Sequence, residues 1–282
     1  MTAGEALTIP CSDGYRLAGR LFLPAGEARG ATVIICPAIF VRQRFYARFA
    51  AYLAEQGYCA LTFDNRGAGR SLAGEQRGWQ HSLAHWGQRD LPAAVAWARA
   101  RSPDHRLFLV GHSMGGQLVG LSPAIHRLDA VVTVAATSAY WRRWAAPMRY
   151  LILAWFGLVP LLGRTMKVFP AGALGLGPDV AAGPVRDWAR WGRHACYIHG
   201  PFDLRPLMDR YRGRVLAYSF TDDEHLGCGA AVRALHAHFT RAELEHRRVD
   251  PEELGLAGLG HFGYFRKEGR PLWDETIAWL QR

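Results

Sequence analysis

Short apolar runs alternate with segments of helical spacing along most of the chain, and this alternation constrains the fold more than any other feature. The run at residues 31–36 is continuous and rich in β-branched residues, which is typical of a strand buried on both faces of a sheet. Further strands are expected at residues 58–63, 107–110, 130–135, 215–220 and 244–249. Helical spacing is found at residues 44–56, 90–101, 114–125, 228–239 and 272–280.

The chain opens with a predicted hairpin, in which residues 8–10 and 16–23 flank Asp13-Gly14, a pair that favours tight turns. A hairpin followed by alternating strands and helices favours a mostly parallel sheet with helices on both faces. Half of the 282 residues are hydrophobic, so a sizeable core can be buried. We therefore predict a single α/β domain that spans residues 1–282.

One segment, at about residues 138–212, interrupts the alternation between two predicted strands. Its most apolar stretch, residues 150–162, is shorter than the roughly 20 residues that a membrane span needs. We predict that the segment forms a helical cap over the active site and that Trp155 and Phe156 contact the substrate. Two alternatives stay open: these residues only pack the cap onto the sheet, or the cap makes weak contact with a membrane surface. The segment is rich in tryptophan, with Trp141, Trp144, Trp155, Trp188 and Trp191.

A glycine-flanked serine follows the strand expected at residues 107–110. The sequence there reads GHSMGG over residues 111–116, and it lies between a strand and a predicted helix, which is the context of a nucleophile elbow. The turn brings strand and helix so close that Gly111 and Gly115 have no room for side chains. We therefore predict Ser113 as a nucleophile.

A serine hydroxyl needs a neighbouring base near neutral pH. We predict His261 as this base, because it lies in a glycine-flanked loop after the last expected strand. The order Ser…Asp…His is typical of the elbow's fold, so the carboxylate should follow the strand at residues 215–220. Asp223 is the first choice from its offset along that strand, and Asp222 stays open because a slip of one residue exchanges the two.

The oxyanion of an acyl-transfer intermediate needs backbone N–H donors. We expect one from Met114, which follows the nucleophile, and one from Ile39 in the loop after residues 31–36, where Pro37 has no N–H to give. The loop at residues 64–71 lacks the lysine and the glycine spacing of a phosphate cradle, so we interpret it as a structural loop braced by Arg66.

Composition and residue spacing bear on the partners, cofactors and location that we expect for the protein. The net charge is +10, but the arginines are scattered and form no nucleic-acid-binding motif, so no nucleic acid partner is expected. No His, Cys, Asp or Glu cluster has metal-ligand spacing, and we predict neither a metal nor an organic cofactor. The five cysteines form no CxxC pair and the first residues form no secretory signal, from which we expect a cytoplasmic protein.

These motifs resemble those of the α/β-hydrolase superfamily. GHSMGG at residues 111–116 is similar to the elbow of its esterases, lipases and serine peptidases, and DNRGAGRS at residues 64–71 is similar to the loop after its fourth strand. GHFG at residues 260–263, with Phe265-Arg266, resembles a poorly characterised bacterial subgroup described only as predicted hydrolases. The insertion falls where this superfamily carries its cap or lid. The chain departs at Pro37-Ala38, where many members have His-Gly.

The resemblance implies a serine hydrolase that cleaves a carboxylic ester or related acyl bond of a small molecule through an acyl-enzyme on Ser113. An acyltransferase or thioesterase would use the same Ser113, His261 and Asp223. A non-catalytic binding protein on the hydrolase fold is a third hypothesis. The sequence leaves the substrate and the oligomeric state undetermined.

Overall fold

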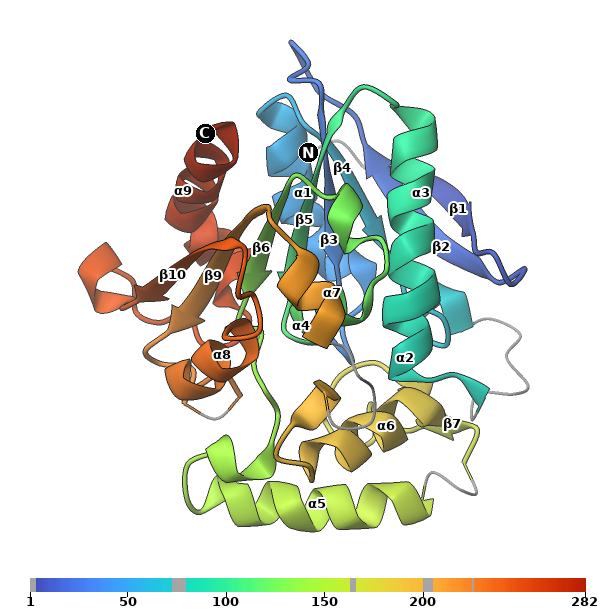
Figure 1. The fold of residues 1–282 in the computed structure, drawn as a ribbon, viewed down its shortest axis with the longest axis vertical. Helices are drawn as coiled ribbons and strands as arrows, with labels where there is room; N and C mark the ends of the chain where they lie inside the picture. Colours follow the sequence, from blue (N-terminus) through green and yellow to red (C-terminus); the bar gives the residue numbers. More distant parts are fainter. Residues whose placement is uncertain (1–3, 73–79, 163–165, 200–204, 225) are drawn as a thin grey trace.

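A computed structural model describes residues 4–72, 80–162, 166–199, 205–224 and 226–282. Its centre is an eight-stranded sheet with the strand order β1-β2-β4-β3-β5-β6-β9-β10 (Figure 1). β1 and β2 form the predicted antiparallel hairpin, β2 pairs antiparallel with β4, and the other neighbouring strands are parallel. The strands are β1 (Glu5–Pro10), β2 (Arg16–Phe22), β3 (Ala31–Cys36), β4 (Cys59–Phe63), β5 (Arg106–His112), β6 (Ala130–Val134), β9 (Arg214–Phe220) and β10 (Glu243–Val249).

Helices cover both faces of this sheet. Successive residues of a strand point to opposite sides, so each central strand contributes side chains to two apolar cores. In β3, Val33 and Ile35 join one apolar core while Ile34 and Cys36 join the other. Helices α1 and α9 cover the first core, and α2, α3, α4 and α8 pack into the second. The predicted α/β class is confirmed. The helices are α1 (Ala47–Glu55), α2 (Leu83–His85), α3 (Leu91–Arg101), α4 (Met114–Gln117), α8 (Gly229–His236) and α9 (Arg270–Gln281).

The continuous helix predicted at residues 114–125 is wrong. The chain forms only the short α4 and then two 3₁₀ turns, at Leu118–Leu121 and Ile125–Arg127. Glycine is a poor helix former, and Gly120 is held by tertiary packing, since a Cβ there would lie 2.8 Å from the Met208 Sδ. Close packing against a neighbouring segment thus replaces the regular helix that the spacing indicated.

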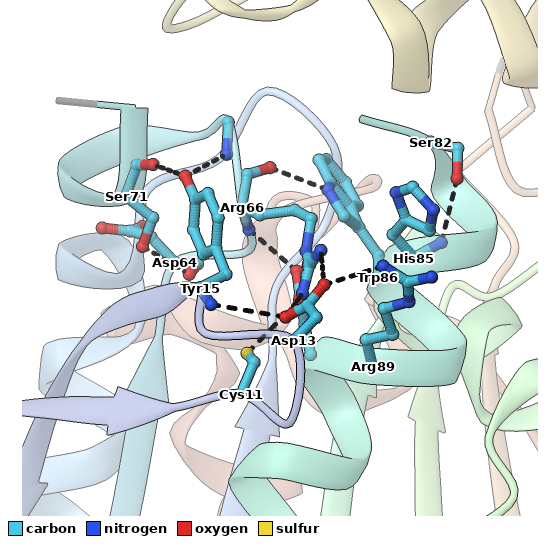
Figure 2. A network of polar contacts seen from close by, with 12 residues as sticks. Cys11, Asp13, Tyr15, Asp64, Arg66, Ser71, Ser82, His85, Trp86 and Arg89 are labelled. Carbon is cyan, nitrogen blue, oxygen red and sulfur yellow. Dashed lines mark hydrogen bonds and ion pairs between the residues drawn. The ribbon is translucent and has the colours of Figure 1, made fainter. Parts of the chain in front are cut away.

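The loop after β4 is braced by a buried arginine, as predicted. The Arg66 guanidinium forms two hydrogen bonds to the Asp13 carboxylate, of 2.7 and 3.2 Å, and lies over the Tyr15 ring (Figure 2). Its Nε and backbone N–H both donate to the fully buried Asp90, at 2.6 and 2.8 Å. Two carboxylates from distant parts of the chain therefore fix the loop on the main body.

The segment at residues 138–212 leaves the sheet after β6 and returns to it at β9. In Figure 1, α5 and α6 lie together at one end of the molecule, with α5 outermost. The Ala181 N–H donates to the Gly67 carbonyl at 2.7 Å, which links the segment to the loop braced by Arg66. Its described elements are α5 (Met148–Leu162), β7 (Val168–Phe169), β8 (Val180–Ala181), α6 (Ala182–Gly192) and α7 (Arg205–Arg210).

Candidate active site

Ser113 lies at a strained turn between β5 and α4. Its backbone has φ 49° and ψ −113°, a conformation that costs a non-glycine residue on the order of 1–3 kcal/mol. The surrounding packing imposes it: a Cβ on Gly115 would lie 2.1 Å from the Cys36 carbonyl oxygen, and one on Gly111 would lie 2.6 Å from the Gly116 Cα. This geometry is that of a nucleophile elbow, and the serine side chain is half-buried there.

His261 and Asp223 form a buried pair. The His261 Nδ1 lies 2.6 Å from the Asp223 Oδ2, and the two residues are only 9% and 4% exposed. Asp222 is engaged elsewhere: its Oδ2 accepts from the backbone N–H groups of Leu259 and Gly260, at 2.7 and 2.8 Å. Of the two carboxylates left open by the sequence, Asp223 contacts the imidazole and Asp222 holds the loop that carries it.

Ser113 and His261 open onto one apolar cavity of about 280 Å³. Among the lining residues that the structure describes, only Ser113, Gln117, Thr137 and His261 carry hydroxyl, amide or imidazole groups, and none carries a carboxylate or an ammonium group. The rest of the wall comes from the loop after β3, the start of α4, the inserted segment and the loops after β9 and β10. It consists of Ala38, Ile39, Phe40, Met114, Ala139, Trp144, Met148, Ile152, Trp155, Leu176, Trp188, Leu226 and Phe262.

The two residues expected to supply backbone donors to an oxyanion belong to the same cavity wall as Ser113. Ile39 and Met114 both line the cavity, and among the described residues no hydrogen bond engages either N–H group. The neighbouring Ala38 N–H donates instead to the Tyr46 hydroxyl at 2.9 Å. The loop after β3 therefore leaves Ile39, rather than Ala38, available to a substrate oxygen.

His112 and Tyr46 form a buried link that the sequence analysis missed. The Tyr46 hydroxyl lies 2.9 Å from the His112 Nδ1, and the His112 Nε2 lies 2.9 Å from the His261 carbonyl oxygen. Burial lowers the pKa of His112 to about 3, with a further lowering by the nearby His261. A neutral His112 with its proton on Nε2 satisfies every contact: Ala38 N–H donates to Tyr46, Tyr46 to His112 Nδ1, and His112 Nε2–H to the His261 carbonyl.

The structure separates the two substrate contacts predicted on α5. Trp155 lines the cavity, but Phe156 does not, since adjacent helical residues point about 100° apart. Phe156 is fully buried, and its ring packs against Trp188 at a centroid distance of 5.3 Å. A Cβ on Gly192 would lie 2.1 Å from this ring. Phe156 thus joins α5 to α6 behind the cavity wall.

A family model described as serine aminopeptidase, S33, matches residues 27–173, which is more than half of the chain. The chain belongs to this α/β-hydrolase family. No curated protein matches it in sequence. The matched residues run from before β3 to β7 and include the elbow with Ser113, whereas Asp223 and His261 lie beyond them.

Solved structures share the fold along nearly the whole chain. A soluble variant of monoglyceride lipase from Saccharomyces cerevisiae, in complex with a substrate analogue, has a TM-score of 0.71 at 16% identity, covering 99% of this chain and 96% of that one. Est1E from Butyrivibrio proteoclasticus has a TM-score of 0.59 at 18% identity, covering 99% and 100%. A serine hydrolase without a lid from Xanthomonas campestris has a TM-score of 0.52 at 17% identity, covering 96% of each chain. At these identities the shared property is the α/β-hydrolase fold.

Proposed function

We propose that the protein is a serine esterase that hydrolyses uncharged carboxylic esters with an apolar acyl group, through an acyl-enzyme on Ser113. The observation that carries the proposal is the 2.6 Å contact between His261 and Asp223 at the cavity that Ser113 enters. Because Nδ1 faces the carboxylate, the other ring nitrogen of His261 is the one available to accept the serine proton.

The reaction divides into two halves. In the first, His261 Nε2 takes the Ser113 proton while Oγ bonds to the ester carbonyl carbon, and the oxyanion accepts from Met114 N–H and Ile39 N–H. The intermediate then loses the alcohol, which leaves with the proton from His261. In the second half, water gives its proton to His261 and attacks the acyl carbon, and the acid departs as the proton returns to Ser113.

The cavity wall supports the choice of an apolar acyl group. A site that buries one face of a substrate must match its charge, because an unpaired charge is expensive to desolvate. An aminopeptidase must hold a free α-amino group, and no lining residue of the described chain offers a carboxylate for it. The aromatic and aliphatic wall favours a neutral acyl chain instead.

The alternatives use the same residues. An acyltransferase or thioesterase would form the same acyl-enzyme on Ser113 but would pass it to another acceptor or receive it from a thioester, so products and substrates separate these activities from ester hydrolysis. A non-catalytic binding protein would keep the cavity without turnover. A serine-reactive fluorophosphonate probe distinguishes it, because labelling requires an activated Ser113.

The proposal is tested with that probe and a series of nitrophenyl esters of increasing acyl length. We expect the wild-type protein to be labelled and to hydrolyse esters with longer acyl chains better than acetyl esters. Ser113→Ala should abolish labelling and lower kcat by about 10³-fold or more, since the triad acts as a unit. Turnover of aminoacyl anilides in preference to esters would overturn the substrate class, and undiminished turnover by Ser113→Ala would overturn the mechanism.

A further inference from the structure

The outer face of α5 is apolar and exposed. Four of its large side chains are about half exposed or more: Tyr150 at 62%, Leu151 at 62%, Leu158 at 49% and Leu161 at 59%. With 3.6 residues per turn these positions fall on one side of the helix, together with the exposed Ala154 and Gly157. We call these six residues the outer stripe.

The opposite face of α5 is apolar as well, but it is already covered. Met148, Ile152 and Trp155 line the active-site cavity, and Phe156 and Val159 are buried in the core. A helix that is hydrophobic all round is normally buried on every side. In Figure 1, α5 is the outermost element at its end of the molecule, so the outer stripe has no cover from the described chain. A contiguous apolar surface of this kind marks an interaction site.

The charge of the segment that carries the outer stripe indicates the occupant. No aspartate or glutamate occurs between Asp129 and Asp179, whereas Arg142, Arg143 and Arg149 are within ten residues of the stripe along the chain. Arg142 and Arg143 are exposed just before α5. A neutral protein partner would not require this one-sided charge. An apolar stripe in a segment that carries arginines and no acidic residue is complementary to a surface of anionic headgroups over hydrocarbon.

We propose that α5 docks the protein on an anionic lipid surface, with the outer stripe immersed at the headgroup boundary and Arg142 and Arg143 against the headgroups. The helix lies in the interface rather than across it, because its 15 residues are about 22 Å long against a hydrocarbon core of about 30 Å. Among the described residues, no helix is long and apolar enough to cross a membrane.

Docking through α5 has a consequence for the cavity. The same helix presents its inner face to the site and its outer face to the lipid, so the acyl pocket lies one helix diameter from the membrane surface. Lipid-dissolved molecules would then reach the protein at its cavity wall. The surface interaction itself does not depend on catalysis, and it stands or falls separately from the proposed esterase activity.

The test is co-sedimentation of the full-length protein with vesicles of phosphatidylcholine alone or of equal parts phosphatidylcholine and phosphatidylglycerol. We expect binding to the mixed vesicles that weakens in high salt, and weaker binding to phosphatidylcholine. The triple variant Leu151→Gln, Leu158→Gln and Leu161→Gln should lower the bound fraction by about tenfold or more, because interfacial binding scales with the apolar area that is immersed. Glutamine has nearly the helix propensity of leucine, so α5 should persist.

Two further variants control the result. Leu23→Gln, at a leucine that is 48% exposed on the main body, should bind as the wild type does. Arg142→Gln with Arg143→Gln should lower binding to the mixed vesicles and leave the phosphatidylcholine level unchanged. If circular dichroism shows that the triple variant is unfolded, Leu158→Gln alone replaces it.

Three outcomes would overturn the proposal. The wild type could stay in the supernatant with both vesicle types, or the folded stripe variant could sediment as fully as the wild type. Alternatively, the wild type could run as a dimer in size-exclusion chromatography, with the stripe variant monomeric and neither bound to vesicles. That result would assign the stripe to a second copy of the chain.

Discussion

At the scale of single residues, Asp222 and Asp223 show how adjacent carboxylates take different tasks. Asp223 turns towards the imidazole of His261, and its second oxygen accepts from the Leu226 N–H at 3.2 Å. Asp222 turns towards the backbone of the loop that carries His261. In the proposed mechanism Asp223 orients the imidazole of His261, while Asp222 holds the loop on which His261 lies.

We predict that Asp223→Asn lowers kcat on a model ester by about 10³-fold or more, while Asp222→Asn costs less than about tenfold. An asparagine at position 223 can donate to Nδ1 and so hold the wrong tautomer of His261, whereas one at 222 keeps an oxygen for both N–H groups. Steady-state kinetics with a thermal unfolding scan of each variant measures this. A larger loss for Asp222→Asn would transfer the orienting role to that residue.

Tyr46 and His112 connect the loop after β3 to the loop that carries His261, so in the proposed mechanism they act as positioning residues. Tyr46→Phe removes the acceptor for the Ala38 N–H and the donor to His112 Nδ1. We predict a roughly tenfold lower kcat with little change in KM, and a loss of about 1–3 kcal/mol of unfolding free energy.

Tyr264→Phe is the matched control for this prediction. It also removes a buried hydroxyl, which contacts the Thr276 Oγ1 at 2.7 Å, so it should lower stability by a similar amount. Its kcat should stay near the wild-type value. Equal losses of kcat in both variants would show that Tyr46→Phe acts only through the stability of the protein, and that Tyr46 has no positioning role.

At the scale of elements, α5 divides its residues between the cavity and the packing behind it. Trp155 lines the apolar cavity beside Ser113, while Phe156 fills the contact with α6. Because the inserted segment also connects to the main body through Ala181 and Gly67, it is held on the sheet independently of any substrate. Its residues can therefore affect either selectivity or packing.

We predict that Trp155→Ala lowers kcat/KM for octanoyl esters by about tenfold more than for acetyl esters, because only the longer chain reaches the removed surface. Phe156→Ala should leave the ratio of the two unchanged and lower the unfolding free energy by about 3–5 kcal/mol, the usual cost of a large core truncation. Rate measurements on both esters, with urea unfolding of both variants, check this. A changed chain-length ratio in Phe156→Ala alone would exchange the two assignments.

For the molecule as a whole, the sequence predicts strands and sharp turns, because these depend on residues that are close together along the chain. The strand at residues 31–36 is found at Ala31–Cys36 because both of its faces are buried. The elbow at Ser113 and the loop that carries His261 are predictable because both are flanked by glycines, which are typical of sharp turns. The helix at residues 114–125 and the Tyr46–His112 link were missed, since each depends on partners far away: Tyr46 is 66 residues from His112, and His112 is 149 from His261.

Two fully buried histidines, His112 and His236, make the unfolding free energy of the whole molecule fall as the pH is lowered. Burial lowers the pKa of His112 to about 3 and that of His236 to about 4, from 6.5 in both cases, with His246 further lowering the value at His236. His236 is held neutral between the Thr133 Oγ1 and the Val232 carbonyl oxygen, both at 2.7 Å. Between these lowered pKa values and 6.5, the two histidines are protonated in the unfolded chain but stay neutral in the folded chain.

The resulting stabilisation is complete above pH 6.5 and is lost as the pH falls towards 4 for His236, because the unfolded state alone gains the proton. Each such histidine contributes a slope of about 1.4 kcal/mol per pH unit in that window. We predict that His236→Gln lowers the unfolding free energy at pH 7 but flattens its fall below pH 6.5 by about this slope. Urea unfolding of both proteins at a series of pH values measures the difference, in which the carboxylates common to both cancel. His126→Gln, at an exposed position, controls for the loss of a histidine from the chain. Parallel curves for the wild type and His236→Gln would show that His236 does not resist protonation in the folded protein.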